Sequence, residues 1–215
     1  MIVPTPPIPA AVPLAPVGIS SALPSSLLAP ARTALSVRSA KLNILDGSSA
    51  SVTGTLLGTQ RAPLARRVVV LQALGNHGWS TLARARTGAK GRFQLTYVAN
   101  ALGTRLLRVR FAGDGLDRPS RRRIGTLNVY RLAGASWYGG GGSLACGGSL
   151  TSGTLGVANK TLPCGTLVTL RYGGRSIRVP VIDRGPYVEG REFDLTEATK
   201  QALGFGDTGN VWSTR

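Results

Sequence analysis

Apolar and polar residues alternate along much of the chain between Leu35 and Tyr130. This period of two is typical of β-strands, because successive side chains of a strand point to opposite faces. Turn residues such as Asp46-Gly47 and Gly75-Asn76 separate the alternating runs. The runs cover residues 41–45, 51–57, 66–74, 79–87, 93–99, 104–111 and 124–130. Seven short strands at this spacing predict an antiparallel β-sandwich over residues 35–131.

Several large apolar residues fall on the predicted inner face of this sandwich. The expected core members are Trp79, Leu82, Phe93, Leu95, Leu107 and Val109. The order V-x-L, G-W, T-x-x-x-G-x-F resembles immunoglobulin-like (Ig-like) modules of bacterial surface proteins, although the region has no cysteine pair. His77 is the single histidine and falls in a predicted turn, where we expect a solvated rather than a catalytic side chain.

A second pattern begins near residue 132 and continues to residue 215. The runs 167–172 and 175–183 are joined by Gly173-Gly174, a two-residue hairpin signal, and Pro180 predicts an edge strand or a bulge. Asp194 and Glu197 are spaced as the cap and third residue of a helix that Gly204 would end. Leu195, Ala198, Ala202 and Leu203 would share one face of that helix. These signals predict a small all-β barrel or sandwich with one short helix.

The first 34 residues match neither pattern. Residues 1–31 contain 8 of the 13 prolines and no charged residue. Proline at this density is incompatible with a helix, and the segment lacks the basic start and unbroken apolar stretch of a signal peptide. We interpret residues 1–34 as a disordered tether or the remnant of a secretion segment. No run of 18 apolar residues is present, so no transmembrane segment is expected.

The charge changes the picture because it is uneven. The formal net charge is +17, and residues 32–131 hold 18 basic and 3 acidic residues, whereas residues 132–215 hold 8 and 6. Such a basic module suits an anionic polymer, or it is simply a solvated surface rich in arginine. Aromatic residues that could stack on bases do not accompany the arginines, so we expect no specific nucleic-acid partner.

The cysteines bear on location and on metal binding. Cys146 and Cys164 lie 18 positions apart in glycine-rich contexts and favour a disulfide, hence an oxidising compartment; two buried free thiols are the alternative. One histidine and two cysteines are too few for a four-ligand zinc site. We therefore expect neither metal nor cofactor.

Four motifs in the second module carry a family resemblance. They are ASWYG (135–139), ACGGSLTSGTLGVANKTLPCGT (145–166), VPVIDRGPY (179–187) and GREFDLTEATKQALGF (190–205). Together they resemble the double-psi β-barrel of rare lipoprotein A (RlpA)-like proteins, in its actinobacterial type; expansins and barwin-like proteins share this barrel. The resemblance implies a six-stranded double-psi β-barrel with one or two short helices over residues 132–215.

The resemblance also implies a function. Some family members are lytic transglycosylases, which cut the MurNAc–GlcNAc bond of peptidoglycan and leave a 1,6-anhydro end. Asp183 matches the family's key acid and would serve as acid/base, with Asp194 in support. An ordinary turn role for Asp183 and a helix-cap role for Asp194 are the alternatives. Substrate contacts would come from Trp137, Tyr138, Asn159, Arg184 and Tyr187.

Two departures from the family pattern favour an alternative reading. Gly148 stands where many members have a glutamate, and Asn159 stands where a histidine is frequent. The alternative is a non-catalytic, expansin-like module that binds or loosens wall polysaccharide. Either reading places the protein outside the cell or in the cell wall, with glycan strands as partner and anionic wall polymers as a second partner of the basic module.

Overall fold

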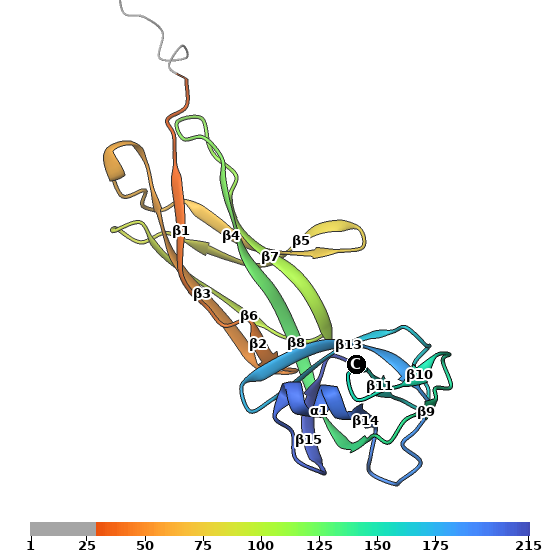
Figure 1. Ribbon diagram of the computed structural model, residues 1–215. Helices are drawn as coiled ribbons and strands as arrows, with labels where there is room; N and C mark the ends of the chain where they lie inside the picture. The colour runs from red at the N-terminus through yellow and green to blue at the C-terminus, as the bar shows by residue number, and fades with distance from the viewer. Residues whose placement is uncertain (1–28) are drawn as a thin grey trace, which may run out of the picture.

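The computed structural model describes residues 29–215. Of the predicted tether (residues 1–34), residues 1–28 therefore lie outside the described residues, whereas Ala31 pairs with Asp117 and β1 begins at Ala34. Figure 1 shows an elongated lobe of β-strands followed by a rounder β-lobe that carries the helix. The elements are β1 (Ala34–Ala40), β2 (Asn43–Leu45), β3 (Ser49–Leu57), the 3-10 turn η2 (Thr59–Arg61), β4 (Val68–Gly75), β5 (Gly78–Arg86), β6 (Arg92–Val98), β7 (Gly103–Phe111), β8 (Ser120–Tyr138), β9 (Gly142–Ser143), β10 (Ser149–Leu150), β11 (Val157–Ala158), β12 (Leu167–Tyr172), β13 (Arg175–Asp183), β14 (Phe193–Thr196), α1 (Glu197–Leu203) and β15 (Gly209–Ser213). The prediction of an all-β protein is confirmed.

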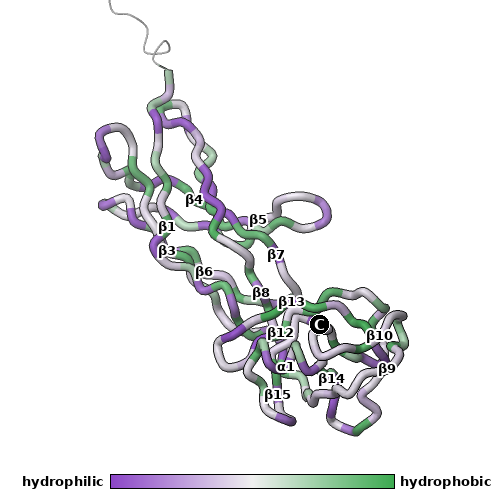
Figure 2. The backbone as a smooth tube through the Cα atoms, in the orientation of Figure 1, coloured by the Kyte–Doolittle hydropathy of each residue, from purple (hydrophilic) through white to green (hydrophobic). Residues whose placement is uncertain are grey.

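The elongated lobe is a sandwich of two sheets. One sheet has the order β1-β3-β6, and the other has the order β5-β4-β7-β8 with β2 added beside β8. Alternate residues of both sheets meet in one core, including Val52, Leu95, Leu107 and Leu127, each at most 1% exposed. In Figure 2, hydrophobic and hydrophilic colours alternate along these strands. The Ig-like topology itself stays a prediction.

Three details of the sandwich differ from the sequence-based expectation. β1 was not predicted, and β2 pairs with β8 in parallel rather than antiparallel. Trp79 was expected in the core, but it lies outside it with the Arg108 guanidinium 4.0 Å above its ring. The expected core members Phe93, Leu95, Leu107 and Val109 are buried, and Leu82 is partly buried against them.

Strand β8 belongs to both lobes. Its first half pairs with β7, and its second half pairs with β15 and β14. Tyr130 lies between the two cores, fully buried, and its hydroxyl donates to Asn43 Oδ1 at 2.9 Å. The predicted boundary at residues 131/132 therefore falls inside a continuous strand, without a linker.

The second lobe is a closed barrel of six strands. Its order is β14-β11-β13-β12-β15-β8, and parallel pairing of β8 with β14 closes the ring. The interior is filled by apolar side chains such as Val157, Val181, Phe193 and Leu195, each fully buried. The hairpin predicted at Gly173-Gly174 is confirmed by the β12–β13 ladder. Strand β13 is not an edge strand, because β11 lies on its other side.

The helix begins two residues later than the sequence pattern predicted. Thr196 is the N-cap, and its side chain accepts a hydrogen bond from the Thr199 backbone N–H. The prediction of Asp194 as the cap is wrong, because this residue lies within β14. Leu195 also belongs to β14, and Ala202 is exposed, so the helix buries Thr199 and Leu203 instead. Gly204 ends the helix in the left-handed conformation, as predicted.

Candidate functional site

Asp183 and Asp194 lie on the two strands that flank β11. Ala158 of β11 is directly opposite Asp183 on β13 and directly opposite Asp194 on β14. Directly opposed residues share a face of a sheet, and neighbouring strands lie about 4.8 Å apart, so the two aspartate α-carbons are roughly 10 Å apart. The sequence-predicted acids are therefore brought together across one small side chain.

A bulge turns Asp183 toward this face. Val181 and Asp183 are two residues apart, and in a regular strand both would point into the barrel core. The β11–β13 register shifts between Val157 and Ala158, so that Val181 faces Val157 and Asp183 faces Ala158. Bulges commonly redirect a side chain in this way. The bulge therefore turns the Asp183 carboxylate to the face of β13 that points away from the barrel core.

The loop between β9 and β10 holds one oxygen of Asp183. Asp183 Oδ1 accepts hydrogen bonds from the backbone N–H groups of Ala145, at 2.9 Å, and Arg184, at 2.8 Å. The next residue of the loop, Cys146, donates its N–H to the Ile182 carbonyl and is bonded to Cys164. The predicted disulfide is confirmed, and it fastens the loop that positions Asp183.

Asp194 is half-buried in β14. Burial raises the pKa of the Asp194 carboxyl above its ordinary value, the nearby Asp183 charge adds to this, and a hydrogen bond from Ser136 opposes it. Ser136 Oγ donates to Asp194 Oδ1 at 2.7 Å. A carboxyl whose pKa is raised is better suited to donate a proton than an ordinary aspartate.

Tyr138 approaches the same two acids from β8. Burial and the negative charges of Asp183 and Asp194 raise the pKa of its hydroxyl, which therefore remains protonated. The hydroxyl oxygen is buried, and no partner among the described residues meets strict hydrogen-bond geometry. The Asp183 carboxylate is nonetheless close enough that hydrogen bonding to it contributes to the raised pKa of Tyr138. This O–H is therefore a donor available to Asp183 or to a ligand.

Trp137 lies apart from this group. It alternates with Ser136 and Tyr138 along β8, so its side chain points to the opposite face. Its indole N–H donates to Asp207 Oδ1 at 2.9 Å, and the Lys200 ammonium lies 3.8 Å from its ring. The structure therefore does not bring Trp137 to the aspartates.

Asn159 and Arg184 are used within the protein. Asn159 is 3% exposed; its Oδ1 accepts from two backbone N–H groups, of Thr161 and Leu162, and its Nδ2 donates to the Glu192 carbonyl. The Arg184 guanidinium donates to the carbonyls of Asn159 and Leu162. Both side chains organise the loop before β12 and leave little free for a substrate.

Tyr187 and Gly148 mark the open sides of the region. Tyr187 follows a cis Gly185–Pro186 bond and is 81% exposed, so its ring is free to stack on a sugar. Gly148 is exposed, and a Cβ atom added there would meet nothing within 4 Å. Its φ of +84° nonetheless favours glycine.

Sequence reasoning missed Ser136, Ala158 and the Ala145 N–H. Ser136 could have been found, because a strand through ASWYG places residues 136 and 138 on one face. The other two depend on strand pairing and on the disulfide-bonded loop, which leave no local pattern. Among residues 29–215, no group of three potential metal ligands occurs, and no helix is long and apolar enough to cross a membrane.

The comparisons with known proteins agree with this architecture. Residues 132–212 match the family model described as lytic transglycolase. A probable endolytic peptidoglycan transglycosylase RlpA of Aquifex aeolicus is 43% identical over 75 residues, covering 33% of this chain and 33% of the relative. The endolytic peptidoglycan transglycosylase RlpA of Pseudomonas aeruginosa is 38% identical over 89 residues, covering 39% of this chain and 26% of the relative.

The family match lies within the barrel. The chain spans between a quarter and a third of the length of these two curated relatives. Among solved structures, the Streptomyces papain inhibitor is 26% identical, with a TM-score of 0.33 over 39% of this chain and 90% of the inhibitor. Residues 132–212 thus form an RlpA-like double-psi β-barrel that matches the lytic transglycolase family model.

Proposed function

We propose that the protein is a secreted lytic transglycosylase that cleaves MurNAc–GlcNAc bonds of peptidoglycan glycan strands and leaves 1,6-anhydro ends. The observation that carries this proposal is the pair Asp183 and Asp194, facing one another across Ala158 in a barrel of the lytic transglycolase family. Disulfide bonds persist in oxidising compartments, so the Cys146–Cys164 bond supports a place outside the cytoplasm. We further propose that residues 35–131 and 132–215 act as two functional units.

We propose separate roles for the two acids. Asp194, whose pKa is raised by burial, is suited to protonate the glycosidic oxygen as its bond to the anomeric carbon breaks. Asp183 accepts hydrogen bonds from two backbone N–H groups on Oδ1, which orient the carboxylate. Its Oδ2 is suited to take the proton of the C6 hydroxyl as that oxygen attacks the anomeric carbon. Tyr138 would donate its free O–H to the sugar or to the resulting carboxylate.

This assignment refines the sequence-based hypothesis. That hypothesis gave Asp183 both proton transfers and Asp194 a supporting role. Burial and the nearby charge of Asp183 raise the pKa of Asp194, and this favours Asp194 as the proton donor. Among the predicted substrate-binding residues, Tyr138 and Tyr187 keep that role in the proposal. Asn159 and Arg184 become positioning residues, because their polar groups are occupied within the protein. Trp137 has no role in the proposed site, because it lies on the opposite face of β8 and bonds Asp207.

One observation favours a second candidate function, glycan binding without cleavage. Gly148 replaces an acid that the family pattern places in this loop, and its surroundings offer no other carboxylate from the loop. An expansin-like protein would use the same face to bind and loosen wall polysaccharide. The exposed Tyr187 ring suits that role equally well.

Digestion of purified sacculi separates the two candidates. Wild type is incubated with sacculi, and soluble products are analysed by mass spectrometry for 1,6-anhydro ends. We expect wild type to release such ends and Asp183→Asn and Asp194→Asn to release them about a hundredfold more slowly, the usual cost of losing one acid–base group. Asp207→Asn is the matched control, because Asp207 is an exposed acid of the same barrel that pairs with Lys200 and Trp137.

The outcomes lead to different conclusions. Equal, negligible release by wild type and both variants, with sacculi still pulled down, would sink the enzyme and support the binding module. If only Asp183→Asn loses the release of 1,6-anhydro ends, both proton transfers would be assigned to Asp183. Loss in the Asp207→Asn control as well would mean that the assay reports stability of the barrel rather than chemistry.

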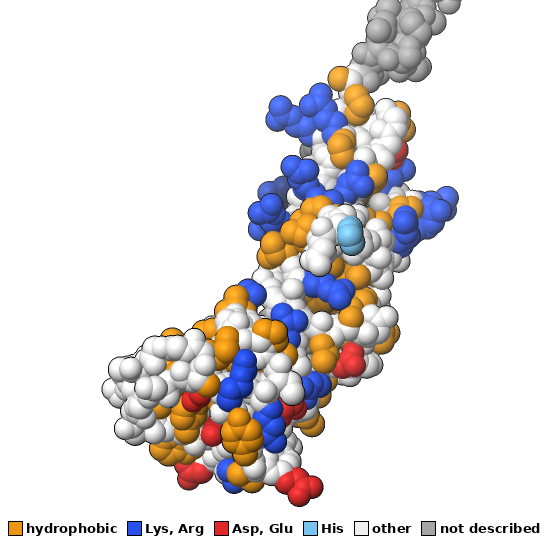
Figure 3. Space-filling view, turned by 90° about the vertical axis from the view of Figure 1, so that its right-hand side faces the viewer, with side chains coloured by type: hydrophobic (Ala, Val, Ile, Leu, Met, Phe, Trp, Pro, Cys, Tyr) orange, Lys and Arg blue, Asp and Glu red, His pale blue; other side chains and the backbone are white. Residues whose placement is uncertain are grey.

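The basic lobe has a second part in the proposal. Eighteen of the 26 basic residues lie between positions 32 and 131. Figure 3 shows Lys and Arg side chains gathered over the elongated lobe on the face in view, whereas acidic side chains gather toward the barrel end. We propose that the elongated lobe holds the protein against anionic wall polymers while the barrel meets glycan.

A further inference from the structure

The outer face of the β5-β4-β7-β8 sheet carries a cluster of arginines, which we call the arginine face: Arg84, Arg108, Arg110, Arg121 and Arg123. Strand pairing fixes their arrangement. Arg110 of β7 is opposite Arg121 of β8, and Arg108 is opposite Arg123. With strands about 4.8 Å apart and like-facing residues about 7 Å apart along a strand, these four α-carbons form a rectangle of roughly 5 by 7 Å. Arg84 of β5 extends the row beyond Val70.

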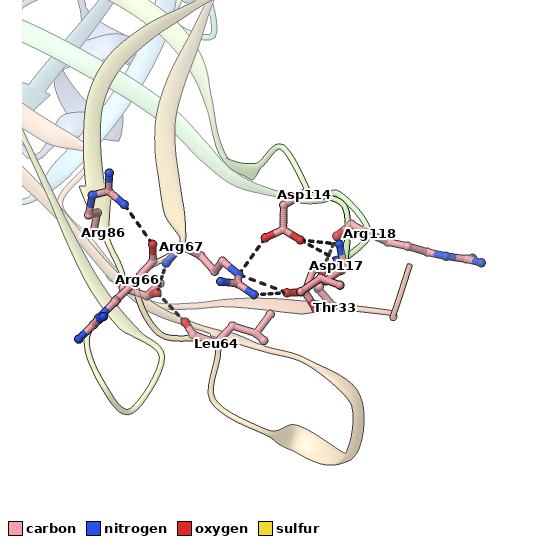
Figure 4. A network of polar contacts seen from close by, with 10 residues as sticks. Thr33, Leu64, Arg66, Arg67, Arg86, Asp114, Asp117 and Arg118 are labelled. Atoms are coloured by element: carbon pink, nitrogen blue, oxygen red, sulfur yellow. Dashed lines mark hydrogen bonds and ion pairs between the residues drawn. The ribbon is translucent and has the colours of Figure 1, made fainter. Parts of the chain in front are cut away.

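The acids nearest to this face are already paired. Arg67 bridges Asp114, at 2.9 Å, and Asp117, at 3.0 Å, at one end of the sheet. Figure 4 shows the Arg67 guanidinium between the two carboxylates. The third acid of the lobe, Asp46, bonds through its backbone N–H to the Tyr130 carbonyl, next to the barrel. Among the described residues, no carboxylate pairs with any member of the arginine face.

Two hollows open among these side chains. One has a volume of about 400 Å³ and lies over a floor of Val70 and Gln72; its lining includes Arg84 and Arg110, and also Asp114 with its ion-pair partner Arg67. The other has a volume of about 380 Å³ and is lined by Trp79, Arg108, Arg121 and Arg123. Val70 and Gln72 are each 8% exposed although they lie on the outer side of the sheet. The arginine stems cover them, so the guanidinium groups surround an uncharged floor.

This arrangement is costly without a counter-charge. Arg108 is held by its Nε–H bond to Gln72 Oε1 at 2.8 Å and by the Trp79 ring. Burial lowers the pKa of Arg108, and the charges of Arg110, Arg121 and Arg123 lower it further. Like charges held together in a folded protein disfavour the compact state, and an anion bound among them removes that repulsion.

We propose that the arginine face is a binding site for a linear polyol phosphate, a wall polymer in which phosphodiester groups alternate with uncharged polyol segments. Guanidinium groups bind phosphate oxygens in pairs, and the uncharged floor fits the polyol segments between them. The choice of a wall polymer rests on the proposed function, whereas the anion site does not depend on any activity of the barrel.

Nucleic acid fits the same face less well. Proteins that bind single strands without sequence preference stack bases on free aromatic rings. The two hollows contain the aromatic residues Phe111, which is only 3% exposed, and Trp79, whose ring is covered by Arg108. The disulfide of the barrel also places the protein in an oxidising compartment, away from cytoplasmic nucleic acid.

The test uses the full chain and synthetic poly(glycerol phosphate) as the probe, with binding measured by calorimetry near physiological salt. The variant changes Arg84, Arg110, Arg121 and Arg123 to Gln. None of these four side chains makes a hydrogen bond or ion pair within the described residues, so folding should be unaffected. The matched control changes Arg38, Arg61, Lys90 and Arg92 to Gln, which removes the same charge from exposed positions elsewhere on the lobe.

We expect the face variant to lose about tenfold or more in affinity and to reduce the dependence of log K on log salt by about 0.7 for each lost phosphate contact. The control should bind within about threefold of wild type. Equal losses in variant and control, or no binding by wild type, would overturn the site. If single-stranded DNA of the same charge binds more tightly than poly(glycerol phosphate), the arginine face would be a nucleic-acid site and the choice of polymer would be overturned.

Two further arms keep the test decisive. If the fourfold variant is less stable than wild type, a double variant, Arg121→Gln/Arg123→Gln, replaces it. This variant changes β8 only, leaves β5 and β7 unaltered, and should still lose several-fold in affinity. Release of 1,6-anhydro products by the face variant from sacculi in solution should equal that of wild type. Failure of the polymer-binding site and failure of the barrel's proposed activity are thus read out separately.

Discussion

At the scale of single residues, the two candidate acids differ in how they are held. Asp183 lies at the end of a bulged strand, with two backbone N–H groups on one oxygen. Asp194 lies within β14, with one hydroxyl donor and a buried carboxyl. Motif resemblance singled out both residues, but the period-two pattern could not show their shared face. That face depends on a bulge at Ile182 and on a helix cap displaced from Asp194 to Thr196.

The raised pKa of Asp194 leads to a stability prediction. The folded state binds the Asp194 proton more tightly than the unfolded state, so this residue's contribution is most favourable below the ordinary aspartate pKa and is lost as the pH rises through the raised pKa. Asp194→Asn keeps an acceptor for Ser136 without the charge. We expect this variant to be more stable than wild type at pH 7 in urea unfolding, and the two curves to converge on acidification.

Asp207→Asn provides a control of opposite sign. Hydrogen bonds from Lys200 and then Trp137 lower the pKa of Asp207 in the folded protein. This residue's contribution is present above the ordinary aspartate pKa and is lost as the pH falls through the lowered pKa. Asp207→Asn should therefore be less stable than wild type at pH 7. An Asp194→Asn protein that is destabilised at pH 7 to the same extent would refute the buried-acid description.

At the scale of elements, strand alternation predicted most of the sandwich. Runs with large inward side chains, such as 93–99 and 104–111, were found as β6 and β7. β1 was missed because ALSVRSA has no fully buried member and presents small polar residues along its edge. The second half of β8 was missed because pairing with β14 and β15 is specified by residues more than 50 positions away.

The disulfide offers a test at this scale. The Cys146–Cys164 bond closes a loop with a sequence separation of 18 and fastens the segment whose Ala145 N–H bonds Asp183. We expect Cys146→Ser/Cys164→Ser to lose about 3 kcal/mol of unfolding free energy, as the chain-entropy model gives for a loop of this size. Chemical denaturation of the variant measures the loss, and wild type treated with a reductant should show the same shift. A loss below about 1 kcal/mol in both would mean that other contacts hold the loop.

At the scale of the whole molecule, charge and proposed chemistry are separated. The lobe with 18 basic and 3 acidic residues carries the arginine face, and the nearly balanced barrel carries the aspartates. Composition alone indicated a polyanion partner but not which face would bind it. Cross-strand pairing of arginines and the pairing of both nearby acids to Arg67 are needed to locate the surface.

Retention on isolated walls should therefore have two components. Interactions of the exposed lobe are screened as the Debye length falls from about 10 Å at 0.1 M salt to about 3 Å at 1 M. We expect wild type to elute progressively over this range in co-sedimentation, and the fourfold arginine-face variant to retain only a weaker, salt-insensitive fraction bound through the barrel. Retention of wild type that is unchanged between the two salt concentrations would exclude an electrostatic anchor.

The continuity of β8 restricts how such a protein can evolve. Strand β8 (Ser120–Tyr138) carries two residues of the arginine face, Arg121 and Arg123, at one end. Its other end carries Ser136 and Tyr138 beside the two acids, and no linker separates the two ends. Because side chains alternate, inserting one residue near Tyr130 would exchange the faces of Trp137 and Tyr138, whereas inserting two would preserve them. We therefore expect this junction to tolerate length changes in even numbers better than in odd ones.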